Sequence, residues 1–310
     1  MDAVPVGRRV GGVVVTYQPC LTRLREVLEA VACQVEHVVI VDNASAEREK
    51  IEVLVSGLPN AELRAFSKNL GVGAALNAGV AVHLAAARDW VLTLDQDTVV
   101  HKGSVGRLFD ELDLLDDEIR KSCGVLAMSR GVARAQGWRR RWIACANLIG
   151  ERGGFSERRS VITSGNLVRA DVFRDVQYNE EFFIDQIDTL FCADVRKLGR
   201  RVLELREPTM DHRLGQTIDT KRGPRAYEGG IRLYYIARNG LSVVLRTDLP
   251  LRVFVRDILG LSRVYVRVNG LRSVAACTSM VLAGMRDGAL KRFGPRSAAD
   301  FFWVPHDDVR

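Results

Sequence analysis

The chain has 310 residues, of which 47% are apolar and 27% are charged, the composition of a globular protein. This apolar content excludes a disordered chain, and six cysteines without CxxC spacing exclude a disulfide scaffold and indicate buried thiols in a reducing compartment. The net charge is +7, and residues 221–310 hold 16 Lys and Arg against 7 Asp and Glu, so the basic excess indicates an anionic partner for the last third.

The first hundred residues alternate between buried strands and amphipathic helices. Strands are predicted at 10–16, 37–42, 61–66 and 89–94, and helices at 21–33, 47–56 and 73–87. This alternation is typical of a doubly wound α/β fold, a mostly parallel Rossmann-like sheet flanked by helices. Ligands of such folds bind at the carboxyl ends of the strands. Polar residues follow three of these ends: Thr16 with Tyr17, Asp42 with Asn43, and Asp95 with Asp97.

The pattern is less regular after residue 100. Residues 131–159 are loop-like, basic and aromatic, and Trp138 and Trp142, which flank three arginines, are expected to contact a bound ligand. Regular structure is expected to resume at 161–166, with a helix from Arg169 and a strand at 201–205.

Asp95 and Asp97 would repel each other at the end of a buried strand. A divalent cation removes that repulsion, because Mg²⁺ and Mn²⁺ prefer oxygen ligands and bridge carboxylates to substrate phosphates. The alternative is an ordinary turn after a strand, where Asp is common. The position after the buried run that starts at Trp90 favours the metal.

Lys68 and Asn69 lie upstream, in a glycine-containing segment that reaches Gly73 at the start of an Ala-rich helix. Free backbone N–H groups at a helix start favour an anion, and Lys68 adds positive charge. The segment matches neither a Walker motif nor GxGxxG, so a plain helix-entry loop is the alternative.

Asp185 and Asp188 stand among apolar residues and share a face if the segment is helical. Desolvation there raises the pKa of a carboxyl group, which suits a general base. The alternative is a helix start at which acidic residues interact with the dipole. His212 follows the strand predicted at 201–205 and is a candidate nitrogen ligand, or else a hydrogen-bonded surface residue.

These segments, in this order, resemble the inverting nucleotide-sugar glycosyltransferases of family 2, which have the GT-A fold. The matching residues lie between about 10 and 240 and comprise Val13–Tyr17, Val41–Ser45, Asn69–Gly73, Asn77–Gly79, Leu94–Thr98, Thr163–Asn166, Phe182–Asp188, Phe191, Cys192, Arg196 and His212–Gly215. The LDQDT and FFIDQID forms look most like the rhamnosyltransferase branch, whose donor is dTDP-L-rhamnose. Other donors that fit the same chemistry are UDP-galactofuranose and UDP-N-acetylhexosamine.

The resemblance implies a role for each matching residue. Thr16, Tyr17 and Asp42 would hold the base and ribose, and Asn69 and Gly73 would line the nucleotide pocket. Asp95 would face the ribose or the Mg²⁺ or Mn²⁺ ion, Asp97 would bind that ion on the diphosphate, and His212 would be a further ligand.

Asp188 would deprotonate the acceptor hydroxyl, in a single displacement at the anomeric carbon. The family more often has Glu-Asp at this site, so Asp185 is a rival base. Arg238 belongs to a downstream Tyr-Tyr…Arg-Asn element that is either phosphate-binding or an ordinary amphipathic helix.

Two parts of the chain are expected to differ in function. Residues 1–220 would form the catalytic domain, with a nucleotide-sugar half to about 100 and an acceptor half after it, and 221–310 a basic helical extension. Four arginines between 251 and 268 fall within an arc of about 60° on an ideal helix, which suits an anionic membrane surface. The alternatives are a solvated face of a packed helix or the contact of a homo-oligomer.

The expected location is the cytoplasm, at the inner face of the plasma membrane, with a glycan or lipid-linked glycan as acceptor. The amino terminus lacks the order of a signal peptide, and no apolar run reaches the roughly 20 residues of a membrane-spanning helix. Nucleic acid is not expected as a partner, because no binding motif appears and the acidic clusters would repel phosphates. A nucleotidyltransferase lacks support because its Gly-rich first loop is missing.

Overall fold

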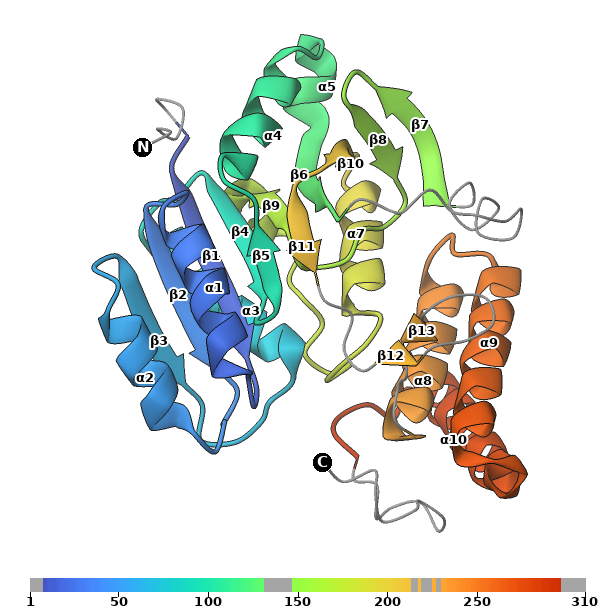
Figure 1. Cartoon of the computed structure of the whole chain (residues 1–310). Helices are drawn as coiled ribbons and strands as arrows, with labels where there is room; N and C mark the ends of the chain where they lie inside the picture. The colour runs from blue at the N-terminus through green and yellow to red at the C-terminus, as the bar shows by residue number, and fades with distance from the viewer. Residues whose placement is uncertain (1–7, 131–146, 213–216, 219–224, 227–229, 297–310) are drawn as a thin grey trace. The chain divides into compact units, whose positions relative to one another are not determined.

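The computed structural model of the chain describes residues 8–130, 147–212, 217–218, 225–226 and 230–296 (Figure 1). The chain divides into two compact units. The first unit comprises residues 1–179 and 191–213, and the second comprises 180–190 and 214–310.

A nine-stranded sheet forms the centre of the first unit, in the order β3-β2-β1-β4-β9-β6-β10-β8-β7 (Figure 1). The strands are β1 (Val10–Thr16), β2 (His37–Asp42), β3 (Ala61–Ala65), β4 (Trp90–Asp95), β6 (Cys123–Ser129), β7 (Leu148–Arg152), β8 (Phe155–Arg158), β9 (Asn166–Arg169) and β10 (Arg201–Pro208). Strands β1 to β4 are parallel, and β9 runs antiparallel to both β4 and β6. The chain leaves β1 toward β2 and β3 and then returns to β4 on the other side of β1. This reversal of strand order marks where ligands bind in open α/β sheets.

Helices connect these strands, and the first three of them confirm the predicted alternation. They are α1 (Leu21–Ala32), α2 (Arg48–Ser56), α3 (Val72–Ala85), α4 (Ser104–Asp113), α5 (Asp117–Ser122) and α7 (Ile187–Lys197), of which α7 spans the border of the two units. The short strands β5 (Thr98–Val100) and β11 (Met210–His212) pair antiparallel beside the sheet.

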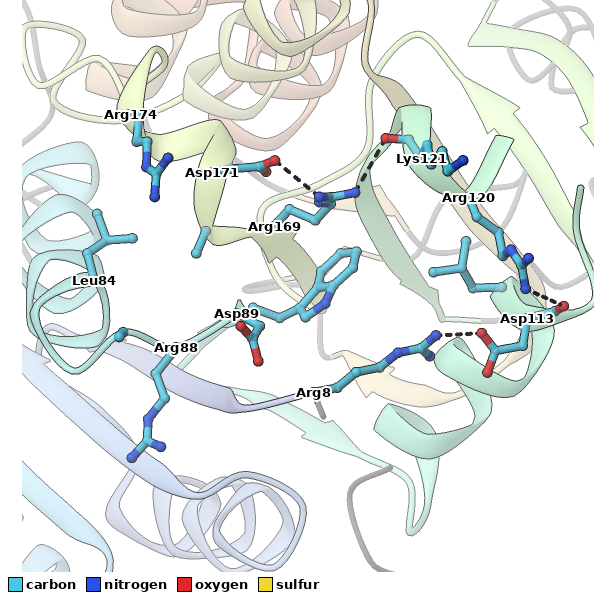
Figure 2. A pocket seen from close by; sticks show the side chains of 14 residues that line it. Arg8, Leu84, Arg88, Asp89, Asp113, Arg120, Lys121, Arg169, Asp171 and Arg174 are labelled. Atoms are coloured by element: carbon cyan, nitrogen blue, oxygen red, sulfur yellow. Dashed lines mark hydrogen bonds and ion pairs between the residues drawn. The ribbon is translucent and has the colours of Figure 1, made fainter. Parts of the chain in front are cut away.

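A cavity of about 770 Å³ lies at the end of the sheet where the parallel strand β4 begins (Figure 2). Trp90 at the start of β4 and Arg169 at the end of the antiparallel β9 line it. Two of its arginines are paired with carboxylates, Arg8 with Asp113 at 2.5 Å and Arg169 with Asp171 at 3.1 Å. The cavity therefore lies at the opposite end of β4 from Asp95.

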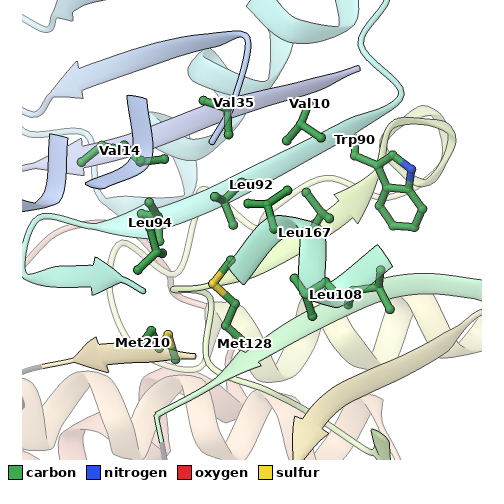
Figure 3. Packing of buried hydrophobic residues seen from close by; sticks show 14 of the residues in the cluster. Val10, Val14, Val35, Trp90, Leu92, Leu94, Leu108, Met128, Leu167 and Met210 are labelled. Carbon is green, nitrogen blue, oxygen red and sulfur yellow. The ribbon is translucent and has the colours of Figure 1, made fainter. Parts of the chain in front are cut away.

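The main core lies between one face of the sheet and helices α1, α2 and α4 (Figure 3). Val10 and Val14 of β1 meet Leu24 and Leu28 of α1 in this cluster, because alternate residues of a strand point to the same face. Leu108 of α4 closes the cluster beside β4 and β6. The core thus fixes the strands whose carboxyl ends carry the candidate site.

Three expectations between residues 131 and 175 are wrong. Regular structure does not resume at 161, because residues 161–165 are irregular and β9 begins only at Asn166. Residues 148–158 form the β7–β8 hairpin instead of a loop. The hydrophobic pattern missed β8 because its buried Glu157 is charged, and Arg201 of β10 neutralises that carboxylate at 2.9 and 3.0 Å. The expected helix from Arg169 is only a 3₁₀ turn (Ala170–Arg174), because the preceding residues are used in β9.

The second unit is helical, with α8 (Gly230–Arg246), α9 (Leu251–Asn269), a 3₁₀ turn (Leu271–Ser273) and α10 (Val274–Ala289). The two-residue strands β12 (Thr217–Ile218) and β13 (Arg225–Ala226) pair with each other. Helix α10 lies directly on the backbone of α8, since a Cβ at Gly284 would stand 2.4 Å from the Tyr234 carbonyl oxygen. In the described parts of the chain, no helix is long and apolar enough to cross a membrane.

Not all cysteines are buried thiols as expected. Cys20 and Cys33 are exposed, because they cap the two ends of α1, where the chain meets solvent. Cys123, Cys192 and Cys277 are buried, as expected.

Candidate active site

The carboxyl ends of β1 and β2 are joined by buried polar contacts. The Thr16 hydroxyl donates to Asp42 Oδ1 at 2.8 Å, and the Ser45 backbone N–H donates to Asp42 Oδ2 at 2.9 Å. Both Thr16 and Asp42 are fully buried. Their side chains therefore hold the loops after β1 and β2 in place and are not exposed at the surface.

Asn43 connects the end of β2 to the loop before α3. Its Nδ2 donates to the Gly71 carbonyl oxygen at 3.0 Å, and its Oδ1 accepts the Leu70 backbone N–H at 2.8 Å. Asn69 Oδ1 accepts the Gly71 N–H, which closes the turn before the helix. Gly73 is buried in the first turn of α3, and the Lys68 side chain is exposed. The glycine-containing segment is thus a helix-entry loop tied to the strand ends.

Gln96 connects the loops that follow β1 and β4. The sequence pattern gave no reason to expect this contact. Gln96 Oε1 accepts the Tyr17 backbone N–H at 2.7 Å, and its Nε2 donates to the Tyr17 carbonyl oxygen at 3.1 Å. The Tyr17 ring is exposed. Gln96 therefore sets Tyr17 at the reversal of strand order, next to the two aspartates that flank Gln96 itself.

Asp95, Asp97 and His212 come together as predicted from the sequence. One ligand atom from each of the three lies within 4.8 Å of the others. The pairing of β11 with β5 produces this arrangement, because it sets His212 opposite Thr98. His212 Nδ1 is 3.6 Å from Asp97 Oδ1. The two carboxylates match the preference of Mg²⁺ and Mn²⁺ for oxygen ligands, and the imidazole offers one nitrogen donor beside them.

A chain of hydroxyl groups connects the backbone of Asp95 to the His212 ring. The Asp95 backbone N–H donates to Ser164 Oγ, which donates to Thr98 Oγ1, which lies 2.6 Å from His212 Nδ1. Burial lowers the pKa of His212, although the neighbouring Asp97 carboxylate opposes that effect. The neutral ring retains one nitrogen with a free lone pair for a cation. Hydroxyl partners of this kind fix the orientation of a metal ligand.

Arg23 supports the same cluster from α1, although nothing in its sequence setting pointed to it. The side chain is buried, its Nε donates to the Asp97 carbonyl oxygen at 2.9 Å, and its Nη2 donates to the Asp211 carbonyl oxygen at 2.9 Å. One guanidinium group thus fixes the backbone next to two of the candidate ligands.

Asp185 and Asp188 do not share a helical face, in contrast to the prediction. Helix α7 begins at Ile187, and Asp185 precedes it with φ of 64°. Arg232 of α8 binds the Asp185 carboxylate through two nitrogens, at 2.5 and 3.2 Å. This pairing keeps Asp185 in a structural contact and leaves Asp188 as the better candidate base.

Asp188 lies in the first turn of α7 and is half-buried. Its Oδ1 accepts the Thr189 backbone N–H at 2.7 Å. Burial raises the pKa of Asp188 to about 6, and the charge of Asp185 adds to the rise while the Thr189 hydrogen bond opposes it. A pKa in this range suits a group that must accept a proton near neutral pH.

Arg238 is fully buried, in contrast to the substrate contact that the resemblance implied. Its Nη2 donates to the Phe182 carbonyl oxygen at 2.9 Å and its Nη1 to that of Gly294 at 2.6 Å. The neighbouring Asn239 Nδ2 donates to the Ile184 and Asp185 carbonyl oxygens at 2.7 and 3.1 Å. The Arg-Asn element therefore holds the backbone just before Asp188. Trp138 and Trp142 lie outside the described residues.

A mostly parallel α/β sheet with a carboxylate pair where its strand order reverses is the arrangement of GT-A glycosyltransferases. The model of "Glycosyl transferase family 2" matches residues 13–177, and the chain belongs to this family. It is 24% identical over 261 residues to the dTDP-rhamnosyl transferase RfbF of Shigella flexneri, covering 80% of this chain and 83% of that protein. The crystal structure of S. aureus TarS 1–349 has the same fold, with a TM-score of 0.53 at 17% identity, covering 92% of this chain and 82% of TarS.

Proposed function

We propose that the protein transfers L-rhamnose from dTDP-L-rhamnose to a hydroxyl group of a glycan acceptor, with inversion and with Mg²⁺ or Mn²⁺. The observation that carries the proposal is the Asp95, Asp97 and His212 cluster at the reversal of strand order. The similarity to a dTDP-rhamnosyl transferase supports the choice of donor.

Asp97 and His212 would hold the cation, together with Asp95. When bound, the ion would neutralise the diphosphate and stabilise the negative charge that develops on the leaving nucleotide. The loops after β1 and β2 and before α3 would surround the nucleoside, since Tyr17, Asn43 and Asn69 are tied there by hydrogen bonds.

Asp188 would act as the general base. The acceptor oxygen attacks the anomeric carbon, its proton passes to the Asp188 carboxylate, and the bond from the anomeric carbon to the diphosphate oxygen breaks. One displacement inverts the anomeric configuration. Asp185 would be the less favoured base, because its carboxylate is already engaged by Arg232.

Residues 1–220 would supply the catalytic machinery and residues 221–310 a basic extension, although the compact second unit also includes 180–190. The acceptor would be lipid-linked and the protein peripheral on an anionic membrane at the cytoplasmic face, because the basic excess of the chain lies in this extension. We do not assign it a nucleic-acid partner.

Release of nucleoside diphosphate tests the proposal. The purified protein is given dTDP-L-rhamnose, UDP-galactofuranose or UDP-N-acetylglucosamine with a cell-wall lipid extract, with and without EDTA. We expect turnover with the dTDP sugar alone and its loss in EDTA. Turnover with a UDP sugar instead would overturn the donor, and full activity in EDTA would overturn the metal.

A further inference from the structure

Helices α9 and α10 expose large apolar side chains on one face of the second unit. On α9, Leu251 is 56% exposed and Leu259 is 48% exposed, with the exposed Val255 between them at helical spacing. The turn before α10 and α10 itself add Leu271, 85% exposed, and Leu282, 61% exposed. Scattered exposed leucines are ordinary, but a contiguous set marks an interaction surface.

The two groups of side chains belong to one surface. A groove of about 660 Å³ runs between α9 and α10, and Leu259 and Leu282 both line it. Other residues of the groove are mainly apolar: Ile258, Val266, Leu271, Val274, Cys277 and Val281. We call this groove and the exposed Leu251 and Val255 the α9–α10 face.

Arginines border the α9–α10 face along its length. Arg252, Arg256, Arg263 and Arg267 fall within about 60° of arc, and the Leu251, Val255 and Leu259 stripe lies next to them, centred roughly 90° away. Arg263 and Arg267 also line the groove itself.

Acidic residues are almost absent from this surface. Residues 251–289 hold six arginines and two aspartates. Asp287 is buried, and Asp257 pairs with Arg256 at 2.9 Å. On the ideal helix, Asp257 lies on the far side of the arginines from the apolar stripe. The face therefore combines exposed apolar surface with an excess of positive charge.

We infer that the α9–α10 face inserts into the surface of an anionic phospholipid bilayer, with Leu259, Leu271 and Leu282 among the acyl chains and the arginines at the phosphates. This deepens the membrane contact of the proposed function by assigning it a surface and two separable forces. The arginines supply an attraction that salt screens, and the leucines supply an apolar contact that salt does not weaken.

A second copy of the chain fits this face less well. In a two-fold contact the same patch meets itself, so the arginine rows of both copies would share one interface. Only one aspartate of residues 251–289, Asp257, is exposed in each copy, because Asp287 is buried. Anionic phosphates neutralise the arginines instead.

Vesicle sedimentation tests the inference on the full chain. Vesicles of phosphatidylcholine, with and without 30% phosphatidylglycerol, are mixed with wild type and two variants, Arg252/Arg256/Arg263/Arg267→Gln and Leu271/Leu282→Ser. Each arginine near an anionic surface contributes about fivefold in partitioning, so the first variant should lose at least a hundredfold on anionic vesicles. The second should lose roughly tenfold. In 0.5 M salt, wild type should still bind more than the leucine variant.

Matched controls exchange exposed residues of the first unit: Leu114→Ser for the leucines, and Lys50/Arg64/Arg107/Lys197→Gln for the arginines. Both should sediment as wild type does. Equal recovery of wild type and the two face variants would overturn the inference. So would a concentration-dependent dimer that the leucine variant abolishes, if wild type is not recruited to vesicles. In calorimetry, dTDP should bind equally well to wild type and to all variants in the presence of Mn²⁺. If wild type itself does not bind dTDP, that result counts against the proposed function and not against the membrane contact.

Discussion

Replacing Asp188 by Asn should abolish turnover and at the same time stabilise the fold. The Asn side chain is nearly the same size, and its Oδ1 can still accept the Thr189 N–H that Asp188 accepts at 2.7 Å. What disappears is a partly desolvated carboxylate whose pKa is raised to about 6. A base that cannot be charged removes the proton transfer, which contributes about 10² to 10⁴ in rate.

The stability change follows from the proton balance. The unfolded chain releases the Asp188 proton near pH 4, whereas the folded chain retains it to about pH 6. Because the folded pKa is the higher one, wild type loses stability as the pH rises from 4 to 6, and the loss is complete above 6. Two pKa units correspond to about 3 kcal/mol, and partial exposure of the side chain reduces this to about 1–2 kcal/mol.

The assay is urea unfolding of wild type and Asp188→Asn at pH 4, 5, 6 and 7.5. The free energies of unfolding should separate between pH 4 and 6 and then remain parallel, with the variant the more stable. Asp185→Asn is the matched control, and we expect it to be less stable than wild type because it loses the Arg232 ion pair. Two results would refute the argument that the Asp188 carboxylate is desolvated in the folded chain. One is that Asp188→Asn is less stable than wild type at pH 7.5, and the other is that the difference in their free energies of unfolding does not depend on pH.

Asp97→Asn should abolish turnover as well. Unlike Asp188→Asn, it should also weaken the binding of dTDP in the presence of Mn²⁺ by at least tenfold, as measured by calorimetry. Equal binding by wild type and Asp97→Asn would show that Asp97 is not a ligand of the cation. Arg23→Gln should weaken Mn²⁺ binding by about 10- to 100-fold although Arg23 is not a ligand, because it frees the backbone at Asp97. The exposed Arg25→Gln on the same helix should have no effect, and equal losses in both variants would contradict the positioning role. Asn239→Ala should lower kcat by about tenfold or more with nucleotide binding unchanged, since it loosens the backbone before Asp188; an unchanged kcat would refute that coupling.

The sequence was sufficient to predict the first four strands and the three helices between them, because each element has a clear hydrophobic period. The place of Asp95 and Asp97 at the ligand-binding end of the sheet was also predictable, since polar residues at strand ends converge in a parallel sheet. His212 joins them through the antiparallel pairing of β11 with β5. The β7–β8 hairpin was not, because a buried carboxylate such as Glu157 satisfies no hydrophobic pattern until its partner Arg201 is placed.

The residues that hold the candidate site in place were harder to predict, because their partners lie far away in the sequence. Arg23 acts on Asp97 across 74 positions of sequence, through a carbonyl oxygen that no residue type reveals. The helical face expected for Asp185 failed because positive φ angles at Phe183, Asp185 and Gln186 delay the helix to Ile187. Asn239 and Arg232 stabilise the backbone at Asp185 from α8, a helix that lies far away in the sequence.

The most direct test of the account is anomalous diffraction from a crystal grown with dTDP and Mn²⁺. A manganese peak in coordination distance of Asp97 and His212, and of the diphosphate oxygens, is the predicted result. A nucleotide bound without metal at this position, or a manganese peak elsewhere in the first unit, would contradict the assignment of the catalytic centre.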